Sequence, residues 1–227
     1  MTGIFDSGDG GLSALSELRK LKPSIDICFF ADRKNAPYGT KSESELIRLI
    51  KRDAEILKKA GADKILMACC TASTVYPHLP SGLKSLLFPI IRPAADEAAR
   101  LTRNGKIAVI ATDATVRSQA FSRELLKKRG VSEVTEIAAQ ELVSLVECGK
   151  KDGRLDGEGR KILFSALSPV KSSGADTLIL GCTHFQHLEM EIACMLPGIT
   201  LVSAAREGAK EMAKITKTDG KGKTVYL

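Results

Sequence analysis

Gly61-Ala62-Asp63-Lys64-Ile65-Leu66-Met67-Ala68-Cys69 is a stretch that the chain repeats, without a gap, as Gly174-Ala175-Asp176-Thr177-Leu178-Ile179-Leu180-Gly181-Cys182. Each copy begins with a Gly-Ala-Asp turn, continues through a short apolar run and ends with a small residue and a cysteine. An apolar run bounded by turn residues is typical of a buried parallel strand, and the cysteine then lies just beyond its C-terminal end. Because ligands bind at that end in open α/β sheets, the repeat predicts a site with one thiol from each of two strands.

The rest of the chain alternates predicted strands and helices in two series, and each series contains one copy of the repeat. Such alternation is typical of parallel sheets joined by right-handed crossovers. We therefore predict an α/β fold of two pseudo-symmetric domains, each a mainly parallel sheet flanked by helices, with the active site in the cleft between them. The first domain is expected to comprise residues 1–92 and 205–227, and the second residues 93–204.

Composition narrows the class of protein. The 227 residues are 44% hydrophobic and 27% charged, which argues against disorder. No apolar run reaches the length of a membrane span and the N-terminus lacks a signal peptide, so we expect a cytoplasmic protein without a membrane partner. In that compartment the six cysteines are expected to be reduced thiols.

The formal charge of +7 raises the question of a nucleic-acid partner. Basic and acidic residues alternate over much of the chain, as in residues 124–129, and this pattern is typical of solvated helix faces. The sequence has no Trp and only three Tyr, so it offers few aromatic rings on which bases could stack. We predict no nucleic-acid partner.

A glycine-rich loop follows the first predicted strand, where Phe5-Asp6-Ser7-Gly8-Asp9-Gly10-Gly11 leads into a helix that begins at Leu12. A strand, such a loop and a helix N-terminus together form a good anion site, because free backbone N–H groups point toward the ligand. The loop lacks the Gly-Lys-Ser/Thr of a nucleotide P-loop. A tight turn with only a packing role is the alternative, but neither reading explains the carboxylate of Asp6.

Two thiols on opposite sides of a substrate can invert a carbon centre next to a carboxylate. One thiolate removes the proton from one face and the other thiol returns a proton to the opposite face, in either direction. Cys69 and Cys182 are the candidates, because a free thiol pKa of about 8.5 makes both forms accessible near neutral pH. Asp6 and His184 are the candidates for tuning the two thiols, and Glu147 is a weaker one.

Other roles for these residues are open at this point. Cys69 and Cys70 could be small buried residues without chemical function. Cys182, His184 and His187 could hold a metal, but the Cys-x-His-x-x-His spacing matches no common zinc site, so no metal is predicted. Cys182 could also be a single nucleophile, with His184 as its base, in a hydrolase or transferase.

Six motifs occur in order along nearly the whole chain. They are Phe5-Asp6-Ser7-Gly8-x-Gly10-Gly11-Leu12, Asp32…Pro37-Tyr38-Gly39-Thr40-Lys41, Ala68-Cys69-x-Thr71-Ala72-Ser73, Ala114-Thr115-x-Arg117-Ser118, Leu145-Val146-Glu147 and Gly181-Cys182-Thr183-His184. With these motifs the chain resembles glutamate racemases, the cofactor-independent members of the aspartate/glutamate racemase superfamily. The resemblance implies interconversion of L- and D-glutamate without a cofactor, and a supply of D-glutamate for peptidoglycan synthesis.

The resemblance also implies roles for individual residues. Cys69 and Cys182 are the implied acid/bases, with Asp6 assisting the first, His184 the second, and Glu147 near the second. The implied partner is a small acidic amino acid, and a homodimer is allowed. The residues implied to hold the substrate are Asp6, Ser7, Tyr38, Gly39, Cys70, Thr71, Thr183 and His184.

The chain departs from the family pattern at several positions. Cys70 stands where the family usually has Asn, and a thiol is a weaker hydrogen-bond donor than an amide. Asp9 replaces a small apolar residue, Arg92 replaces a common acidic one, and residues 140–144 lack the family's prolines. The alternatives are therefore a racemase of another acidic amino acid such as aspartate, a ligand-binding relative without activity, and an enzyme that uses one thiol.

Overall fold

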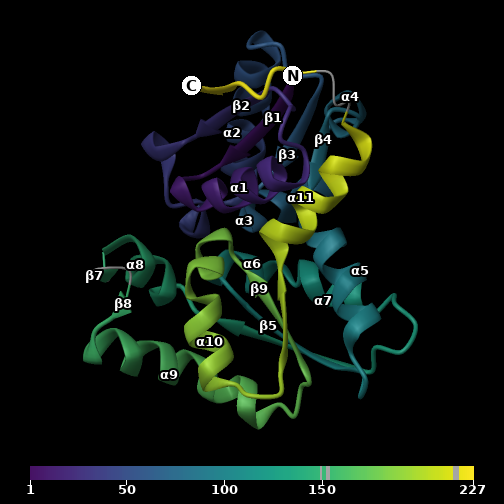
Figure 1. The fold of residues 1–227 in the computed structure, drawn as a ribbon. Coiled ribbons are helices and arrows are strands. Elements are labelled where there is room, and N and C mark those ends of the chain that lie inside the picture. The colour runs from purple at the N-terminus through teal and green to yellow at the C-terminus, as the bar shows by residue number, and fades with distance from the viewer. Residues whose placement is uncertain (149, 152–153, 217–219) are drawn as a thin grey trace.

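The computed structural model describes residues 1–148, 150–151, 154–216 and 220–227 and shows two α/β units, one above the other in Figure 1. The strands of the first unit are β1 (Thr2–Asp6), β2 (Ile27–Ala31), β3 (Lys64–Met67), β4 (Leu87–Pro89) and β11 (Thr224–Tyr226). They form one parallel sheet in the order β11-β2-β1-β3-β4.

The second unit repeats this arrangement. Its strands are β5 (Lys106–Ala111), β6 (Glu133–Ala138), β9 (Thr177–Gly181) and β10 (Thr200–Ser203). They form a parallel sheet whose order, read as β6-β5-β9-β10, matches β2-β1-β3-β4 of the first. The two copies of the repeated stretch thus form β3 and β9, in equivalent places. The predicted fold class, two parallel sheets flanked by helices, is confirmed.

Helices connect the strands, and several of them begin at a side-chain cap. For example, α2 (Glu43–Lys59) begins with a capping box, in which the backbone N–H of Ser42 donates to Glu45 and the N–H of Glu45 donates to Ser42. The other α-helices are α1 (Leu12–Leu21), α3 (Cys70–Thr74), α4 (Ser81–Lys84), α5 (Ile91–Leu101), α6 (Asp113–Ser118), α7 (Ala120–Leu125), α8 (Glu141–Cys148), α9 (Gly157–Ser172), α10 (Glu189–Met195) and α11 (Ala204–Ile215). Short 3-10 helices are η1 (Asp9–Gly11), η2 (Arg33–Asn35), η3 (Tyr38–Thr40), η4 (Tyr76–His78) and η5 (Thr183–Leu188), and β7 (Lys150–Lys151) pairs antiparallel with β8 (Arg154–Leu155).

The Gly-Ala-Asp turn of each repeat has a structural reason. Gly61 and Gly174 follow α2 and α9 with φ of +92° and +67°, a left-handed conformation that glycine adopts at little cost. Each aspartate then ties the turn to the residues before the neighbouring strand. Asp63 lies 3.5 Å from the terminal amine of Met1, and Asp176 accepts hydrogen bonds from the loop before β5. The turns therefore set β3 beside β1 and β9 beside β5.

The two units share an apolar core. One cluster of buried side chains includes Ile4 and Leu66 of the first sheet together with Val109 and Ile179 of the second. Helices α1, α5 and α11 pack together along this junction, and α11 carries the chain back from β10 to the first unit (Figure 1). The units are thus joined along one side by packing of the kind found inside a single domain.

The boundary between the domains stays a proposal. All strands of the first sheet lie within residues 1–92 and 205–227, and all strands of the second lie within residues 93–204. Helix α5 begins at Ile91, just before the proposed boundary, and contacts α11 as well as β9 of the second sheet. The junction is therefore a continuous helical layer in which the boundary falls within one helix.

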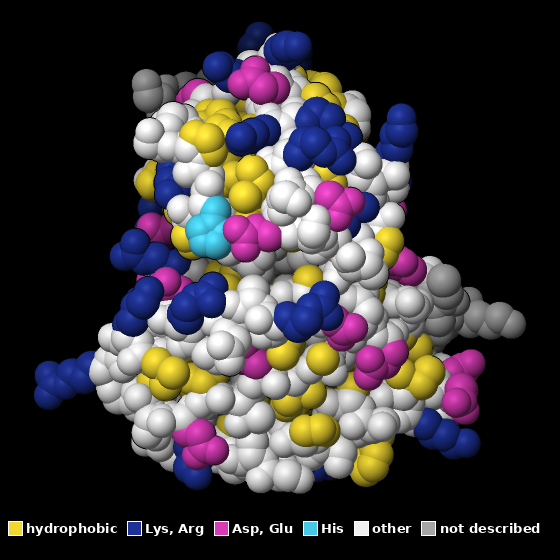
Figure 2. Space-filling model, turned by 180° about the vertical axis from the view of Figure 1, so that it is seen from behind, with side chains coloured by type: hydrophobic (Ala, Val, Ile, Leu, Met, Phe, Trp, Pro, Cys, Tyr) yellow, Lys and Arg dark blue, Asp and Glu magenta, His cyan; other side chains and the backbone are white. Residues whose placement is uncertain are grey.

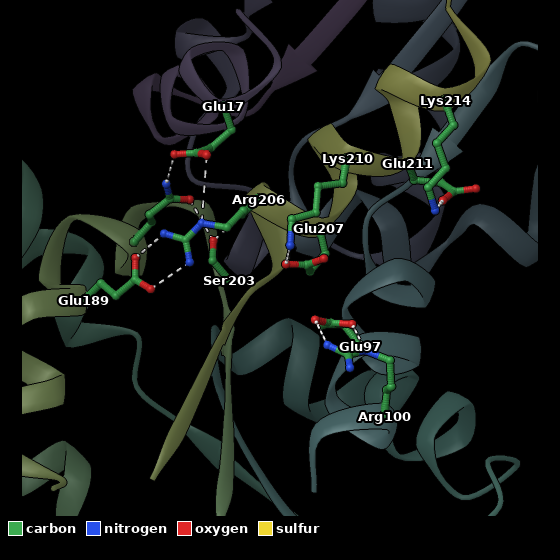
Figure 3. Close-up of polar contacts among 11 residues, drawn as sticks. Glu17, Glu97, Arg100, Glu189, Ser203, Arg206, Glu207, Lys210, Glu211 and Lys214 are labelled. Carbon is green, nitrogen blue, oxygen red and sulfur yellow. Dashed lines mark hydrogen bonds and ion pairs between the residues drawn. The ribbon is translucent and has the colours of Figure 1, made fainter. Parts of the chain in front are cut away.

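A polar cluster bridges the units beside this core (Figure 3). Arg206, near the start of α11, donates hydrogen bonds of 2.8 and 2.6 Å to Glu189 of α10 and lies 3.9 Å from Glu17 of α1. Gln186 adds a second path, since its side chain donates to Glu17 and accepts from Ser203. Bidentate arginine–carboxylate pairs are stronger than neutral hydrogen bonds, so the cluster ties α1 to α10.

The surface carries mixed charge. In the view from behind, basic side chains stand among acidic ones on both units (Figure 2). Several are paired with a residue three positions away in the chain, such as Lys127 with Glu124 and Lys214 with Glu211, and exposed pairs of this kind contribute little stability. Within the described ranges, no helix has both the length and the apolar character needed to cross a membrane.

Arg206→Gln should lower the free energy of unfolding by about 1–3 kcal/mol, because Glu17 and Glu189 would then lie partly buried without their shared cation. Urea unfolding followed by circular dichroism measures this change. Lys214→Gln is the matched control, since it breaks an exposed pair and should cost less than about 0.5 kcal/mol. Equal losses in the two variants would contradict a bridging role for Arg206.

Candidate active site

A cavity of about 310 Å³ lies between the two units, where residues that follow β1, β3, β5, β6 and β9 converge. This is the edge at which open α/β sheets bind ligands. The cavity brings together every site residue selected from the sequence except Asp6, whose side chain is buried next to it. The lining consists of Ser7, Gly8, Ala36, Pro37, Tyr38, Gly39, Cys69, Cys70, Thr71, Thr112, Gln140, Val143, Ser144, Glu147, Cys182, Thr183 and His184.

Cys69 lies between β3 and α3 and caps that helix. Its sulfur accepts a hydrogen bond from the backbone N–H of Ala72 at 3.5 Å and lies 3.6 Å from the hydroxyl of Ser7. Burial raises the pKa of the Cys69 thiol to about 12, and the negative charge of Asp6 adds to the rise. The thiol of the free protein is therefore protonated at neutral pH.

Cys182 lies at the equivalent place after β9. Its sulfur lies 3.6 Å from Nδ1 of His184, and Nε2 of the same ring lies 3.2 Å from a carboxylate oxygen of Glu147. The second contact is an ion pair and not an aligned hydrogen bond, since Nε2 has no hydrogen-bond partner among the described residues. Burial raises the pKa of the Cys182 thiol above its usual range. His184 thus lies between the thiol and the carboxylate.

Asp6 ends β1 and is buried. One carboxylate oxygen accepts hydrogen bonds from the backbone N–H groups of Gly8 and Gly11, at 3.3 and 2.9 Å, and the other has no partner in the described part of the chain. Burial raises the pKa of this carboxyl, while the charge of His184 opposes the rise. The expected anion site of the glycine-rich loop is therefore filled by the chain's own carboxylate, which also explains why Asp6 is there.

A glycine in the same loop lets the two units meet. A side chain at Gly10 would place its Cβ 2.4 Å from the hydroxyl of Thr183 and 2.6 Å from Nδ1 of His184. Ser13 adds a hydrogen bond across the contact, since its hydroxyl donates to the carbonyl of Thr183 at 3.3 Å. Any larger residue at position 10 would push the loop after β1 away from the Cys-Thr-His turn after β9.

Threonines join the units beside the cavity. The hydroxyl of Thr71, in the first unit, lies 2.9 Å from that of Thr112 and 3.2 Å from that of Thr115, both in the second unit. Arg117 adds a bond to the carbonyl of Gly39 at 3.4 Å. Thr71 therefore belongs to a hydroxyl network whose hydrogens can reorient, and it reaches the ligand space as part of that network.

Tyr38 contributes its ring and backbone to the cavity wall, while its hydroxyl contacts two buried carboxylates. The hydroxyl lies 2.7 Å from Asp32 and 2.7 Å from Asp53, and Arg52 pairs with both. A phenol donates one hydrogen, so a proton on one carboxyl is needed for the second bond. Burial raises the pKa of Asp53 to about 6, which allows this. The network holds η3 in place at the cavity wall.

Two departures from the family pattern lie outside the cavity lining. Asp9 is exposed and pairs with Arg33, so its charge faces a cation and solvent. Arg92 lies 3.7 Å from Asp96 on α5. The departures that border the ligand space are therefore Cys70 and, within residues 140–144, Gln140, Val143 and Ser144.

The lining is poor in charged groups. No Lys or Arg lines the cavity in the part of the chain that the structure describes, and the thiol of Cys70 is buried with its pKa raised by that burial and by the two neighbouring cysteines. A carboxylate placed in the cavity would therefore face His184 and neutral N–H and O–H groups. Within the described ranges, no cluster of three His, Cys, Asp or Glu side chains could hold a metal ion.

Sequence reasoning missed four lining residues of the second unit. Thr112 follows β5, which is equivalent to β1, and Gln140 follows β6. Val143 and Ser144 lie on the first turns of α8. Their position after predicted strands could have indicated them, because residues that follow parallel strands of one sheet meet at the same edge. No sequence motif marks them.

Comparison with known proteins agrees with this geometry. Residues 25–212 match the model of the Asp/Glu/Hydantoin racemase family. The chain belongs to this family. The glutamate racemase of Aquifex aeolicus is 36% identical over 97% of this chain and 85% of its own length. The predicted class, an amino-acid racemase of a family that works without pyridoxal phosphate, is confirmed.

Solved structures of family members have the same fold. The glutamate racemase isoform RacE1 of Bacillus anthracis superposes with a TM-score of 0.90 at 30% identity, covering 100% of this chain and 86% of its own. The glutamate racemase of Francisella tularensis, solved in complex with D-glutamate, gives a TM-score of 0.87 at 27% identity, with 99% and 86% covered. This chain therefore shares its fold with a glutamate racemase that was solved with D-glutamate bound.

Tyr38→Phe should lower the free energy of unfolding by about 1–3 kcal/mol, because it leaves a buried oxygen of Asp32 or Asp53 without its donor. Chemical unfolding measures the change. Tyr226→Phe is the control: this side chain is exposed, and its loss of a hydroxyl should cost less than about 0.5 kcal/mol. If Tyr38→Phe were as stable as the wild type, the network would not be what holds η3.

Proposed function

We propose that this racemase interconverts L- and D-glutamate by proton transfer between two cysteines. The observation that carries the proposal is the pair Cys69 and Cys182, because equivalent ends of two equivalent strands place both residues on one cavity. Glutamate as the substrate is supported by the glutamate racemase relatives and by the related structure that contains D-glutamate.

In the proposed reaction the α-carbon of the substrate lies between the two sulfurs. One thiolate removes the α-proton from one face, and the other thiol donates a proton to the opposite face of the resulting carbanion. In the reverse direction the two sulfurs exchange roles. The residues proposed to hold the substrate are Asp6, Ser7, Tyr38, Gly39, Cys70, Thr71, Thr183 and His184.

Each thiol must lose its proton before it acts as the base, although burial holds both pKa values high. His184 contacts Cys182 and Glu147, so it is placed to accept the proton of that thiol, and Glu147 stabilises the imidazolium. Asp6, a carboxyl whose own pKa is raised, is the corresponding group near Cys69. The ammonium of the substrate adds a positive charge that favours a thiolate.

The proposal includes the cellular role of the reaction and the oligomeric state of the protein. D-glutamate made by this enzyme would feed peptidoglycan synthesis in the cytoplasm, as the family resemblance implies. Rescue of a bacterium that requires D-glutamate tests this role, and failure of the wild-type gene to rescue it would count against it. Light scattering of the pure protein tests the homodimer, which a monomeric mass would exclude.

Pure protein without added pyridoxal phosphate should remove the circular dichroism of L-glutamate and of D-glutamate. Cys69→Ser and Cys182→Ser should each lower kcat by about 100- to 10,000-fold, because each removes one of two essential acid/bases. Cys194→Ser, at an exposed thiol, is the control and should keep full activity.

Three results would change the proposal. Activity retained in either active-site variant would exclude the two-thiol mechanism. If the protein racemised aspartate and not glutamate, aspartate would be its substrate. Absence of activity on both would favour a ligand-binding relative.

The value of kcat/KM should rise with pH from pH 6 to 8, by at most about tenfold per pH unit, in the direction in which Cys69 is the base. The pKa of the Cys69 thiol is raised to about 12, so the fraction of thiolate grows with pH throughout this range. Initial rates at constant ionic strength measure the profile. A profile that falls above pH 6 would show that a protonated group, and not a thiolate, limits the reaction.

A further inference from the structure

Gln140 lines the cavity but has no part in the proposed chemistry. It lies between β6 and α8, at the ligand-binding edge of the second sheet. Its side-chain oxygen is buried and has no hydrogen-bond partner among the described residues. A buried amide atom without a partner is unfavourable, so the site favours a ligand that pairs with this amide.

The amide of Gln140 reaches across the cavity to the first unit. A Cβ added to Gly39 would lie 2.7 Å from Oε1 of Gln140, so the amide lies against the wall that η3 forms. A half-turn of the carboxamide replaces its oxygen with an NH₂ group that has two donors. The same position can therefore offer N–H groups to a carboxylate.

Gln140 immediately precedes α8, at the opposite end of that helix from Glu147. Gln140, Ser144 and Glu147 follow the i, i+4, i+7 spacing of one helix face, and all three line the cavity. Glu147 contacts His184, which in turn contacts Cys182. At about 1.5 Å per residue, Gln140 lies roughly 10 Å further along this face. It therefore faces the distal part of a substrate whose α-carbon lies at the sulfurs.

The first unit offers a distal carboxylate no charged donor, although Tyr38 and Gly39 of the same wall are among the residues proposed to hold the substrate. Cys70 is a buried thiol and a weak donor. The described lining contains no Lys or Arg that could pair with a second negative charge. Because a carboxylate buried without donors is costly, a dicarboxylic substrate needs a neutral donor here, and Gln140 is placed to supply it.

We propose that Gln140 is a specificity-determining residue, which donates its side-chain N–H groups to the carboxylate at the end of the substrate's side chain. This inference rests on the proposed function and names the residue that selects the acidic side chain. Gln140 touches no reacting atom, so it acts on substrate binding and not on proton transfer.

Gln140→Leu removes the side-chain N–H donors and keeps a side chain of similar size. In this variant KM for both glutamate enantiomers, and Kd for D-glutamate by calorimetry, should rise about 10- to 100-fold, while kcat changes by less than about threefold. Gln140→Glu, of the same shape but negatively charged, should weaken binding further. Glu141→Gln changes the exposed neighbouring residue and should match the wild type.

Norvaline distinguishes a loss of carboxylate recognition from a general loss of structure. Its side chain has the length of the glutamate side chain but lacks the distal carboxylate. The wild type should exchange the α-proton of glutamate with solvent faster than that of norvaline, as measured by NMR in deuterated water. Gln140→Leu should reduce this ratio at least about tenfold. A residue with only a structural role would slow both substrates equally, and an unchanged ratio would overturn the proposal.

The outcomes separate this inference from the proposed function. Glutamate racemised by the wild type, with KM and Kd unchanged in Gln140→Leu, overturns the role of Gln140 and leaves the racemase proposal standing. If the wild type binds glutamate but does not racemise it, the racemase proposal is overturned. The ratio of the Kd values of Gln140→Leu and the wild type then still decides the role of Gln140. A wild type that neither binds nor racemises glutamate overturns both.

Discussion

The close contact at Gly10 is the constraint on which the site depends. The loop after β1 and the turn after β9 approach so closely that an added Cβ would lie 2.4 Å from Thr183. That approach brings Asp6 and His184 near enough for their charges to interact, and it sets Cys69 and Cys182 on one cavity. The shared apolar core, the threonine network and the Arg206 cluster hold the units in this position from other sides.

Burial and charge together define what the cavity can do. Both strand-end thiols have pKa values raised by burial, and the described lining has no Lys or Arg to offset this. In the proposed mechanism the substrate itself brings the positive charge that makes a thiolate accessible. The protein supplies a proton acceptor near each sulfur and neutral donors for the carboxylates. In that proposal the ligand is a small amino acid with an acidic side chain.

Much of the fold and of the cavity lining could be predicted from the sequence, because the turn residues of the repeated stretch determine where its two strands lie. Gly61 and Gly174 permit the left-handed turn, and the following aspartates tie each turn to its neighbouring strand. The residues after both strands line one cavity, and their role in catalysis stays a prediction. The glycine-rich loop was harder to interpret, since only the fold shows that its N–H groups bind Asp6. Gln140 and Thr112 could not be found, because no motif marks them and their place depends on how the two sheets face each other.

The most direct test of the account follows the α-hydrogen of L-glutamate in deuterated water at early times. Two thiols acting on opposite faces predict that the first D-glutamate formed carries deuterium at the α-carbon, while the remaining L-glutamate keeps its proton. This follows because the removed proton stays on one sulfur and the deuteron comes from the other. Protium retained in the first D-glutamate would show that a single group serves both faces, and would contradict the two-cysteine account.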